Sequence, residues 1–222
     1  MPNDPTTWTE QKLRGLLGVI DAGLTVGLGS PAPGEMCVEA AVQFASGAAH
    51  DDRPPCVASF VREVMIVLND SLWTSPGARA KGMRRAAIAQ LGSAGVIDEL
   101  MFGRRLAELT TRRFVPLALR TAADGIGDVH SAKLLEAAER CARDGDHASA
   151  ARAARAAGAA ERAWAVGEVG EVGAARAAEA EWGESGDRVL SAFAEMIVEI
   201  LQELGSPGCE WLWLTEPSGE EN

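Results

Sequence analysis

Apolar residues recur at helical spacing along most of the 222-residue chain, and this periodicity limits the folds open to it. The pattern is clearest over 187–204, where one face is apolar and Glu195, Glu199 and Glu203 form an acidic ridge at i, i+4 spacing. No stretch shows sustained alternation of apolar and polar residues, and the chain contains no tyrosine. The sequence therefore predicts an all-α fold, a compact multi-helix bundle.

Local signals predict where several helices begin or break. Thr9 is a predicted N-cap, and Ser75 followed by Pro76 is predicted to cap and begin another helix. Pro55 suits the first position of the helix that follows it. Pro116 lies inside a later helical pattern, which predicts a kink one turn earlier or a break into two helices.

The helix predicted after Pro55 is apolar nearly all round. Its main stripe consists of Val57, Phe60, Val61, Val64, Met65 and Leu68. Ile66 and Val67 widen this stripe. A helix that is apolar on most sides is predicted to lie at the centre of the core.

Changes in amino-acid composition along the chain predict three segments. Residues 1–126 are predicted to form a helical core, 127–186 an Ala-rich helical hairpin or arm, and 187–222 a core-completing helix with a Trp-bearing tail. The middle segment is rich in alanine, which favours helix but leaves little apolar surface to bury. Either tight alanine packing or partial disorder is compatible with it. The tail predicts either one short strand or two tryptophans, Trp211 and Trp213, laid over the core.

The net charge and the cysteine content indicate which partners and which cellular compartment suit the protein. The formal net charge of −11 and the pI of about 4.8 disfavour nucleic acid and anionic membranes as partners. The N-terminal sequence has no basic segment followed by an apolar run, and no window of about 18 residues is continuously apolar. The cysteines are Cys37, Cys56, Cys141 and Cys209, without a CxxC pair. These features predict a cytoplasmic protein with reduced thiols and no membrane span.

The stretch MCVEAAVQFASGAAHDDRPPC, residues 36–56, is the one that most suggests chemistry. Cys37, Glu39 and Cys56 (the last preceded by a proline) resemble part of the motif of zinc-dependent cytidine deaminases. That resemblance implies a zinc-bound water with the Glu as proton carrier. Ser59 stands where the third ligand is expected, so His50 is the candidate third ligand in a different arrangement.

The alternative interpretation of this stretch is structural. Cys37 and Cys56 are then small buried residues at adjacent helix starts. Glu39 caps a helix or faces water, and His50 is a loop residue. Under this interpretation the chain has neither a metal nor a catalytic residue here.

Arginine is concentrated between residues 76 and 120, a segment that contains nine basic and three acidic residues. Residues 175–222, by contrast, contain two arginines and eleven acidic residues. Forked guanidinium groups could hold a small anionic ligand. The candidates are Arg84, Arg85, Arg104, Arg105, Arg112 and Arg113. The alternative is internal charge matching, in which the acidic ridge lies against the arginine-bearing helices.

A polar segment that contains a tryptophan separates the helix after Pro55 from the helix that begins at Pro76. LNDSLW, with Asn69, Asp70 and Trp73, predicts a packed helix–helix corner or the lining of a small pocket. GEMCVEAAV, LNDSLW, ARAKGMRRAAIAQLGS and RRFVPLALR are together similar to a family of uncharacterised bacterial and bacteriophage proteins. The similarity covers residues 30–120 and implies a compact helical unit, with no activity attached.

These observations predict a non-catalytic protein that binds a partner protein or a small anionic ligand, alone or as a homo-oligomer. One alternative is a zinc-dependent hydrolase or deaminase that uses Cys37, Glu39, His50 and Cys56. The other is a scaffold whose Ala-rich arm packs against copies of itself.

Overall fold

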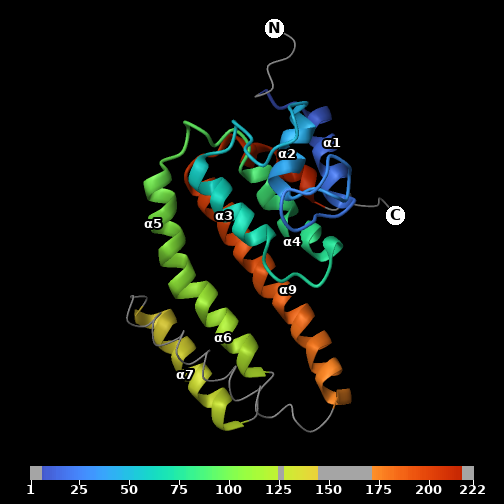
Figure 1. Ribbon diagram of the computed structural model, residues 1–222. Helices are drawn as coiled ribbons and strands as arrows, with labels where there is room; N and C mark the ends of the chain where they lie inside the picture. The colour runs from blue at the N-terminus through green and yellow to red at the C-terminus, as the bar shows by residue number, and fades with distance from the viewer. Residues whose placement is uncertain (1–6, 125–127, 145–171, 217–222) are drawn as a thin grey trace, which may run out of the picture. The chain divides into compact units, whose positions relative to one another are not determined.

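The computed structural model describes residues 7–124, 128–144 and 172–216, and within these ranges the fold is all-α, as predicted (Figure 1). The α-helices are α1 (Glu10–Asp21), α2 (Val38–Ser46), α3 (Ser59–Asn69), α4 (Pro76–Ala89), α5 (Glu99–Leu109), α6 (Val115–Asp124), α7 (Asp128–Asp144) and α9 (Val172–Glu203). A π-helical turn, η1 (Thr110–Phe114), and a 3-10 helix, η2 (Pro207–Thr215), complete the described elements. Among these residues, pairing of the β type is limited to an isolated bridge between Gly29 and Met36. The described helices include none with the length and apolar character that crossing a membrane requires.

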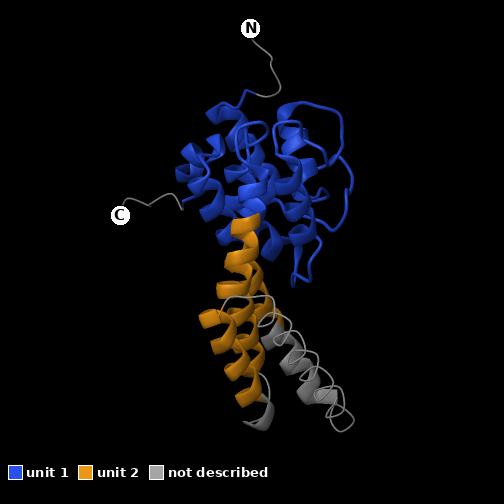
Figure 2. Cartoon of the chain, turned by 90° about the vertical axis from the view of Figure 1, so that its left-hand side faces the viewer, with its two compact units in different colours: residues 1–103, 194–222 blue, residues 104–193 orange. Residues whose placement is uncertain are grey.

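The chain divides into two compact units (Figure 2). Unit 1 consists of residues 1–103 and 194–222, and unit 2 of residues 104–193. The division falls inside α5 and α9. The boundaries predicted at residues 126 and 186 do not coincide with it and stay a prediction. The central part of the predicted Ala-rich arm, 145–171, lies outside the described residues.

The core of unit 1 is built by α1, α2, α3 and α4 with the last turns of α9. α2 packs against α1, α3 and α4, and η2 packs against α4. The amphipathic stripe of α1 is buried through Leu13, Leu16, Leu17 and Ile20. The predicted apolar face near the end of α9 is also buried, through Met196, Ile197, Ile200 and Leu201. Because α2 has helices on several sides, even its polar positions are enclosed.

Two predicted N-caps are confirmed and one predicted helix start is wrong. The hydroxyl of Thr9 accepts a hydrogen bond from the Lys12 amide, and that of Ser75 accepts one from the Ala78 amide. Pro55, however, lies in a turn, and α3 begins only at Ser59.

The start of α3 is fixed by a residue 40 positions away in the sequence. The carboxylate of Glu99 accepts hydrogen bonds from the Phe60 amide at 2.7 Å and from the Ser59 hydroxyl at 3.1 Å. A carboxylate at a helix N-terminus satisfies free amides and favours the helix dipole. Glu99 therefore supplies the cap that the residues preceding α3 do not.

Unit 2 contains the predicted interruption near Pro116. The helix changes to a π turn over η1, where the Val115 amide bonds to the Thr110 carbonyl. Proline has no amide to complete the preceding α-helical turn, which favours such an irregularity. α6 then packs on α7 through a small core that includes Leu119, Leu134, Ala137, Ala138 and Cys141. Close alanine packing is thus present in the described part of the Ala-rich segment.

The C-terminal tail forms η2, so the predicted short strand is wrong. Leu212 and Leu214 are buried, whereas Trp213 is largely exposed and does not cover the core. Gly208 lies so close to α4 that a Cβ atom there would be 2.1 Å from the Ile88 carbonyl oxygen. Only glycine permits this approach of the two backbones.

Candidate functional site

Cys37 acts as a structural cap. Its Sγ accepts a hydrogen bond from the Ala40 amide at 3.4 Å, and the residue is buried as the alternative interpretation predicts. Burial raises the pKa of the Cys37 thiol to about 11, an effect that the bond from Ala40 only partly offsets. A thiol in this environment stays protonated at neutral pH, whereas a nucleophilic cysteine must be a thiolate.

Cys56 and His50 do not complete a metal site with Cys37. Cys56 is buried, which raises the pKa of its thiol, and the indole of Trp8 beside it lowers that pKa in part. His50 lies in a loop, as the structural interpretation predicts, with Nε2 3.1 Å from the Gly29 carbonyl oxygen. Over the described ranges no three His, Cys, Asp or Glu side chains come together as metal ligands. The zinc alternative stays a prediction without a ligand set in this part of the chain.

Glu39 is fully buried, so the prediction that it caps a helix or faces water is wrong. Neither carboxylate oxygen has a hydrogen-bond partner in the described structure. Burial raises the pKa of Glu39 to about 8; the nearby Gln90 side chain and the Arg62 charge lower it, and the charge of Asp52 raises it. Glu39 therefore holds a proton at neutral pH. Its side chain is not exposed to solvent.

Two glutamines share this buried environment, and sequence reasoning missed both. Gln90, at the C-cap of α4, is fully buried, and neither its oxygen nor its nitrogen has a partner among the described residues. Gln43 follows Glu39 by one helical turn and is also buried, with its Oε1 unpartnered. Buried polar atoms without partners are rare, because each costs free energy. The signal in the sequence was a glutamine within the apolar run AIAQL.

The LNDSLW segment forms a packed helix–helix corner, which is one of the two structures predicted for it. The Asn69 side chain accepts from the Val38 amide at 3.1 Å and donates to the Thr25 carbonyl at 2.8 Å, which ties α3 to the start of α2. The indole of Trp73 donates to the Leu68 carbonyl at 2.9 Å. The guanidinium of Arg79 donates to backbone carbonyls, including that of Asn69. These bonds satisfy the polar groups internally.

Two of the candidate anion-binding arginines have internal partners in unit 1. Arg84 pairs with Asp21 at 2.8 Å. Arg85 pairs with Glu195 at 3.2 Å and with Glu216 at 3.0 Å. Since Glu195 belongs to the acidic ridge, the predicted internal charge matching is confirmed for this pair.

The other candidates belong to unit 2. Arg105 pairs with Glu108 at 2.9 Å, and Arg112 lies 3.9 Å from the same carboxylate. Arg104, Arg112 and Arg113 are exposed around the π-helical turn. Binding of a small anion by these residues stays a prediction.

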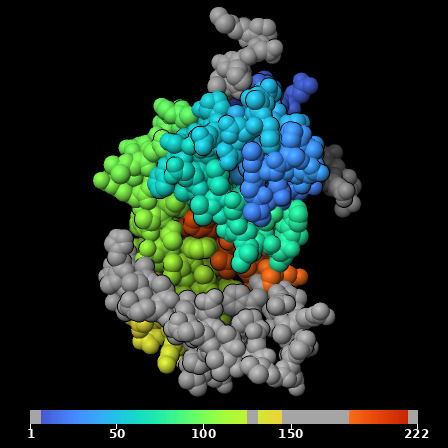
Figure 3. Space-filling model, in the orientation of Figure 1, coloured from blue at the N-terminus to red at the C-terminus, as the bar shows by residue number. Residues whose placement is uncertain are grey.

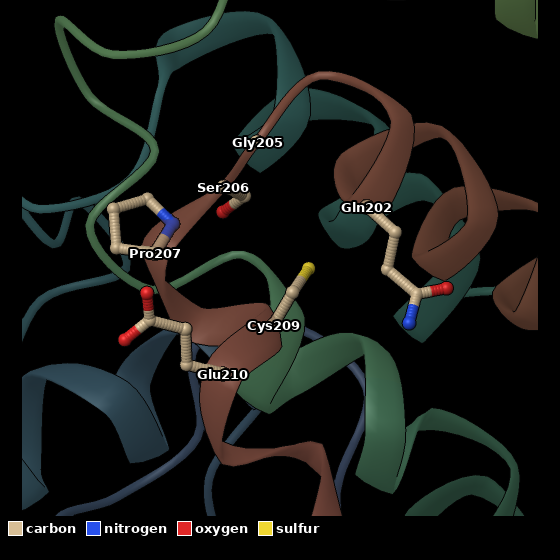
Figure 4. Close-up of a pocket in the computed structure, with 6 residues that line it drawn as sticks. All are labelled: Gln202, Gly205, Ser206, Pro207, Cys209 and Glu210. Carbon is tan, nitrogen blue, oxygen red and sulfur yellow. The ribbon is translucent and has the colours of Figure 1, made fainter.

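A pocket lies at the junction of α9 and η2 (Figure 4). It has a volume of about 390 Å³ and is lined by Gln202, Gly205, Ser206, Pro207, Cys209 and Glu210. The Ser206 hydroxyl donates to the Ala89 carbonyl at 2.6 Å, so it is already engaged. Burial raises the pKa of the Cys209 thiol to about 11, which disfavours a nucleophilic role.

An apolar surface on unit 1 was not expected from the sequence. Phe60, Val67 and Leu100 are 38%, 70% and 64% exposed, and Val64 is half-buried between the first two along α3. We call these four residues the α3–α5 face. α3 lies at the front of unit 1 in Figure 1, and its atoms reach the surface in the same view in Figure 3. The prediction that this helix lies at the centre of the core is therefore wrong for one of its sides.

Comparison of the chain with models of protein families, with curated proteins and with solved structures finds no match. The similarity of its motifs to the bacterial and bacteriophage family, and to the deaminase motif, therefore stays a prediction. The geometry of the described residues is what bears on function.

Proposed function

We propose that the chain is a non-catalytic helical protein whose unit 1 binds a protein partner through the α3–α5 face. The observation that carries the proposal is the exposure of Phe60, Val67 and Leu100 on two neighbouring helices. Single exposed apolar residues are ordinary, but a group of large ones on two linked helices is typical of an interaction surface. An apolar side chain that moves from water into an interface contributes about 25 cal/mol per Å² of buried surface.

The face is held in place before any partner arrives. The rings of Phe60 and Phe102 pack edge to face, with centroids 5.9 Å apart and an interplanar angle of 83°. The Phe60 ring lies directly over Gly103, where a Cβ atom would be 2.5 Å from it. Glu99 joins the first turn of α3 to that of α5. A preformed surface loses little conformational entropy on binding, which supports a docking role.

The environments of the candidate reactive groups support the non-catalytic part of the proposal. The thiols of Cys37 and Cys209 have a pKa of about 11, and burial also raises the pKa of Cys56. Glu39 is enclosed within the helices around α2. Each of these groups is in the wrong protonation state, or out of reach, for attack on a substrate.

A peptide-binding assay tests the proposal. Fluorescently labelled amphipathic helical peptides are titrated with the protein, and binding is followed by fluorescence anisotropy. We expect binding that Leu100→Lys weakens at least tenfold. Leu135→Lys is the matched control, because Leu135 is an exposed leucine on α7 of unit 2 and receives the same change of charge.

Two outcomes oppose the proposal. Equal weakening by both lysine variants shows a general charge effect, and absence of binding by every peptide shows that the face does not dock helices. Sedimentation velocity over a concentration series tests whether a second copy of the chain binds to the α3–α5 face instead. Self-association that Leu100→Lys abolishes would identify the homo-oligomer as the partner.

A further inference from the structure

We infer that the element that docks on the α3–α5 face is a basic amphipathic helix, with apolar residues on one side and lysine or arginine beside them. This inference rests on the proposed function and adds the chemistry of the partner. It is carried by the distribution of charge around the apolar residues.

Acidic side chains lie beside the α3 residues of the face and just before α5. Glu63 is exposed on α3, three residues after Phe60 and four before Val67, so it lies on the same side of the helix. Asp70 is exposed at the end of α3, and Asp98 is exposed just before α5. Carboxylates therefore lie among the apolar residues of the α3–α5 face and at its ends.

The cation on α3 does not neutralise this charge. Arg62 is half-buried, and its charge acts on the buried Glu39 from the neighbouring helix. Asp70 accepts hydrogen bonds from the Gly27 amide and the Asn69 side chain, neither of which carries a charge. A partner with lysine or arginine beside its apolar residues would place cations against the acids.

The spacing of the face suits a helix. Phe60, Val64 and Val67 follow one another along two turns of α3, a length of about 10 Å at 1.5 Å per residue. A second helix lying along this stripe would meet it with residues at i, i+3 or i+4, and i+7. A second copy of the chain is disfavoured, because pairing two such faces would bring Glu63 close to like charges, and the chain has a net charge of −11.

Three labelled 18-residue peptides test the inference. They share one leucine stripe at helical spacing and carry lysine, glutamine or glutamate at the remaining positions. We expect the lysine peptide to bind at least tenfold more tightly than the glutamate peptide at low salt. The difference should shrink in 0.5 M salt, because exposed charges are then screened within about 4 Å.

Charge reversal on the protein provides the decisive comparison. Glu63→Lys should weaken binding of the lysine peptide about tenfold and strengthen that of the glutamate peptide. Glu210→Lys, at an exposed acid on η2, makes the same change of charge away from the face and should alter neither by more than about twofold.

The outcomes separate this inference from the proposed function. Equal binding of the three peptides, or tighter binding of the glutamate peptide, overturns the inference; if Leu100→Lys still abolishes that binding, the docking face stands. Equal effects of Glu63→Lys and Glu210→Lys overturn the inference as well. Absence of binding by all three peptides overturns both.

Discussion

Replacement of Glu39 by glutamine should remove a pH dependence from the stability of unit 1. The carboxyl of Glu39 is fully buried on α2 beside Gln90, without a hydrogen-bond partner in the described structure. Glutamine has nearly the same shape and is neutral at every pH. Glu39→Gln therefore imitates the protonated carboxyl and cannot lose its proton.

The expected magnitude follows from the raised pKa. Burial moves the pKa of Glu39 from 4.5 to about 8 in the folded chain. Below pH 4.5 the carboxyl is protonated in both states and its contribution is fully present. As the pH rises toward 8, the unfolded chain releases the proton while the folded chain keeps it. Stability should then fall by about 1.4 kcal/mol per pH unit, on the order of 5 kcal/mol in total.

Urea unfolding at a series of pH values between 5 and 9 measures this effect. Tryptophan fluorescence suits it, because four of the six tryptophans, Trp8, Trp73, Trp211 and Trp213, belong to unit 1. The variant should gain stability relative to the wild type up to pH 8, and the difference should then level off. Glu63→Gln, at an exposed carboxyl, is the control. A difference between Glu39→Gln and wild type that is the same at pH 5 and pH 8 would refute the reasoning.

Three further substitutions test contacts that hold unit 1 together, each by the free energy of urea unfolding. Glu99→Ala removes the cap of α3 and should cost about 1 kcal/mol; a loss below about 0.3 kcal/mol would mean that water replaces the cap. Gly208→Ala forces a Cβ atom against the Ile88 carbonyl and should cost about 1–3 kcal/mol, whereas an unchanged midpoint would show that η2 moves away freely. Asn69→Leu leaves the buried Val38 amide unpaired and should cost about 1–3 kcal/mol; a neutral effect would contradict the role given to that bond.

Features that depend on neighbours in sequence could be predicted. The caps at Thr9 and Ser75 each bond to an amide three residues away, so the local sequence contains the whole interaction. Pro116 interrupts its helix through its own missing amide. The apolar stripes of α1 and the end of α9 also follow from periodicity alone.

Features that depend on distant residues could not be predicted. Glu99 caps a helix 40 residues earlier, a pairing that no local pattern reveals. Glu39 is buried because helices pack around α2 on several sides, and periodicity along one helix does not report how many neighbours it has. For the same reason, the apolar pattern predicted that α3 lies at the centre of the core, although Val67 is exposed to solvent.

The four cysteine thiols can report when the structure around each of them opens. Cys37 and Cys56 are buried in unit 1 and Cys141 in unit 2, while Cys209 is partly accessible. A thiol reagent can react with a buried cysteine only when the structure around that cysteine opens. Mass spectrometry of the labelled chain would therefore time the opening of each unit in the unaltered protein, with Cys209 as the internal reference. Equal labelling rates for Cys37 and Cys141 would mean that the two units open as one, and unequal rates that each opens by itself.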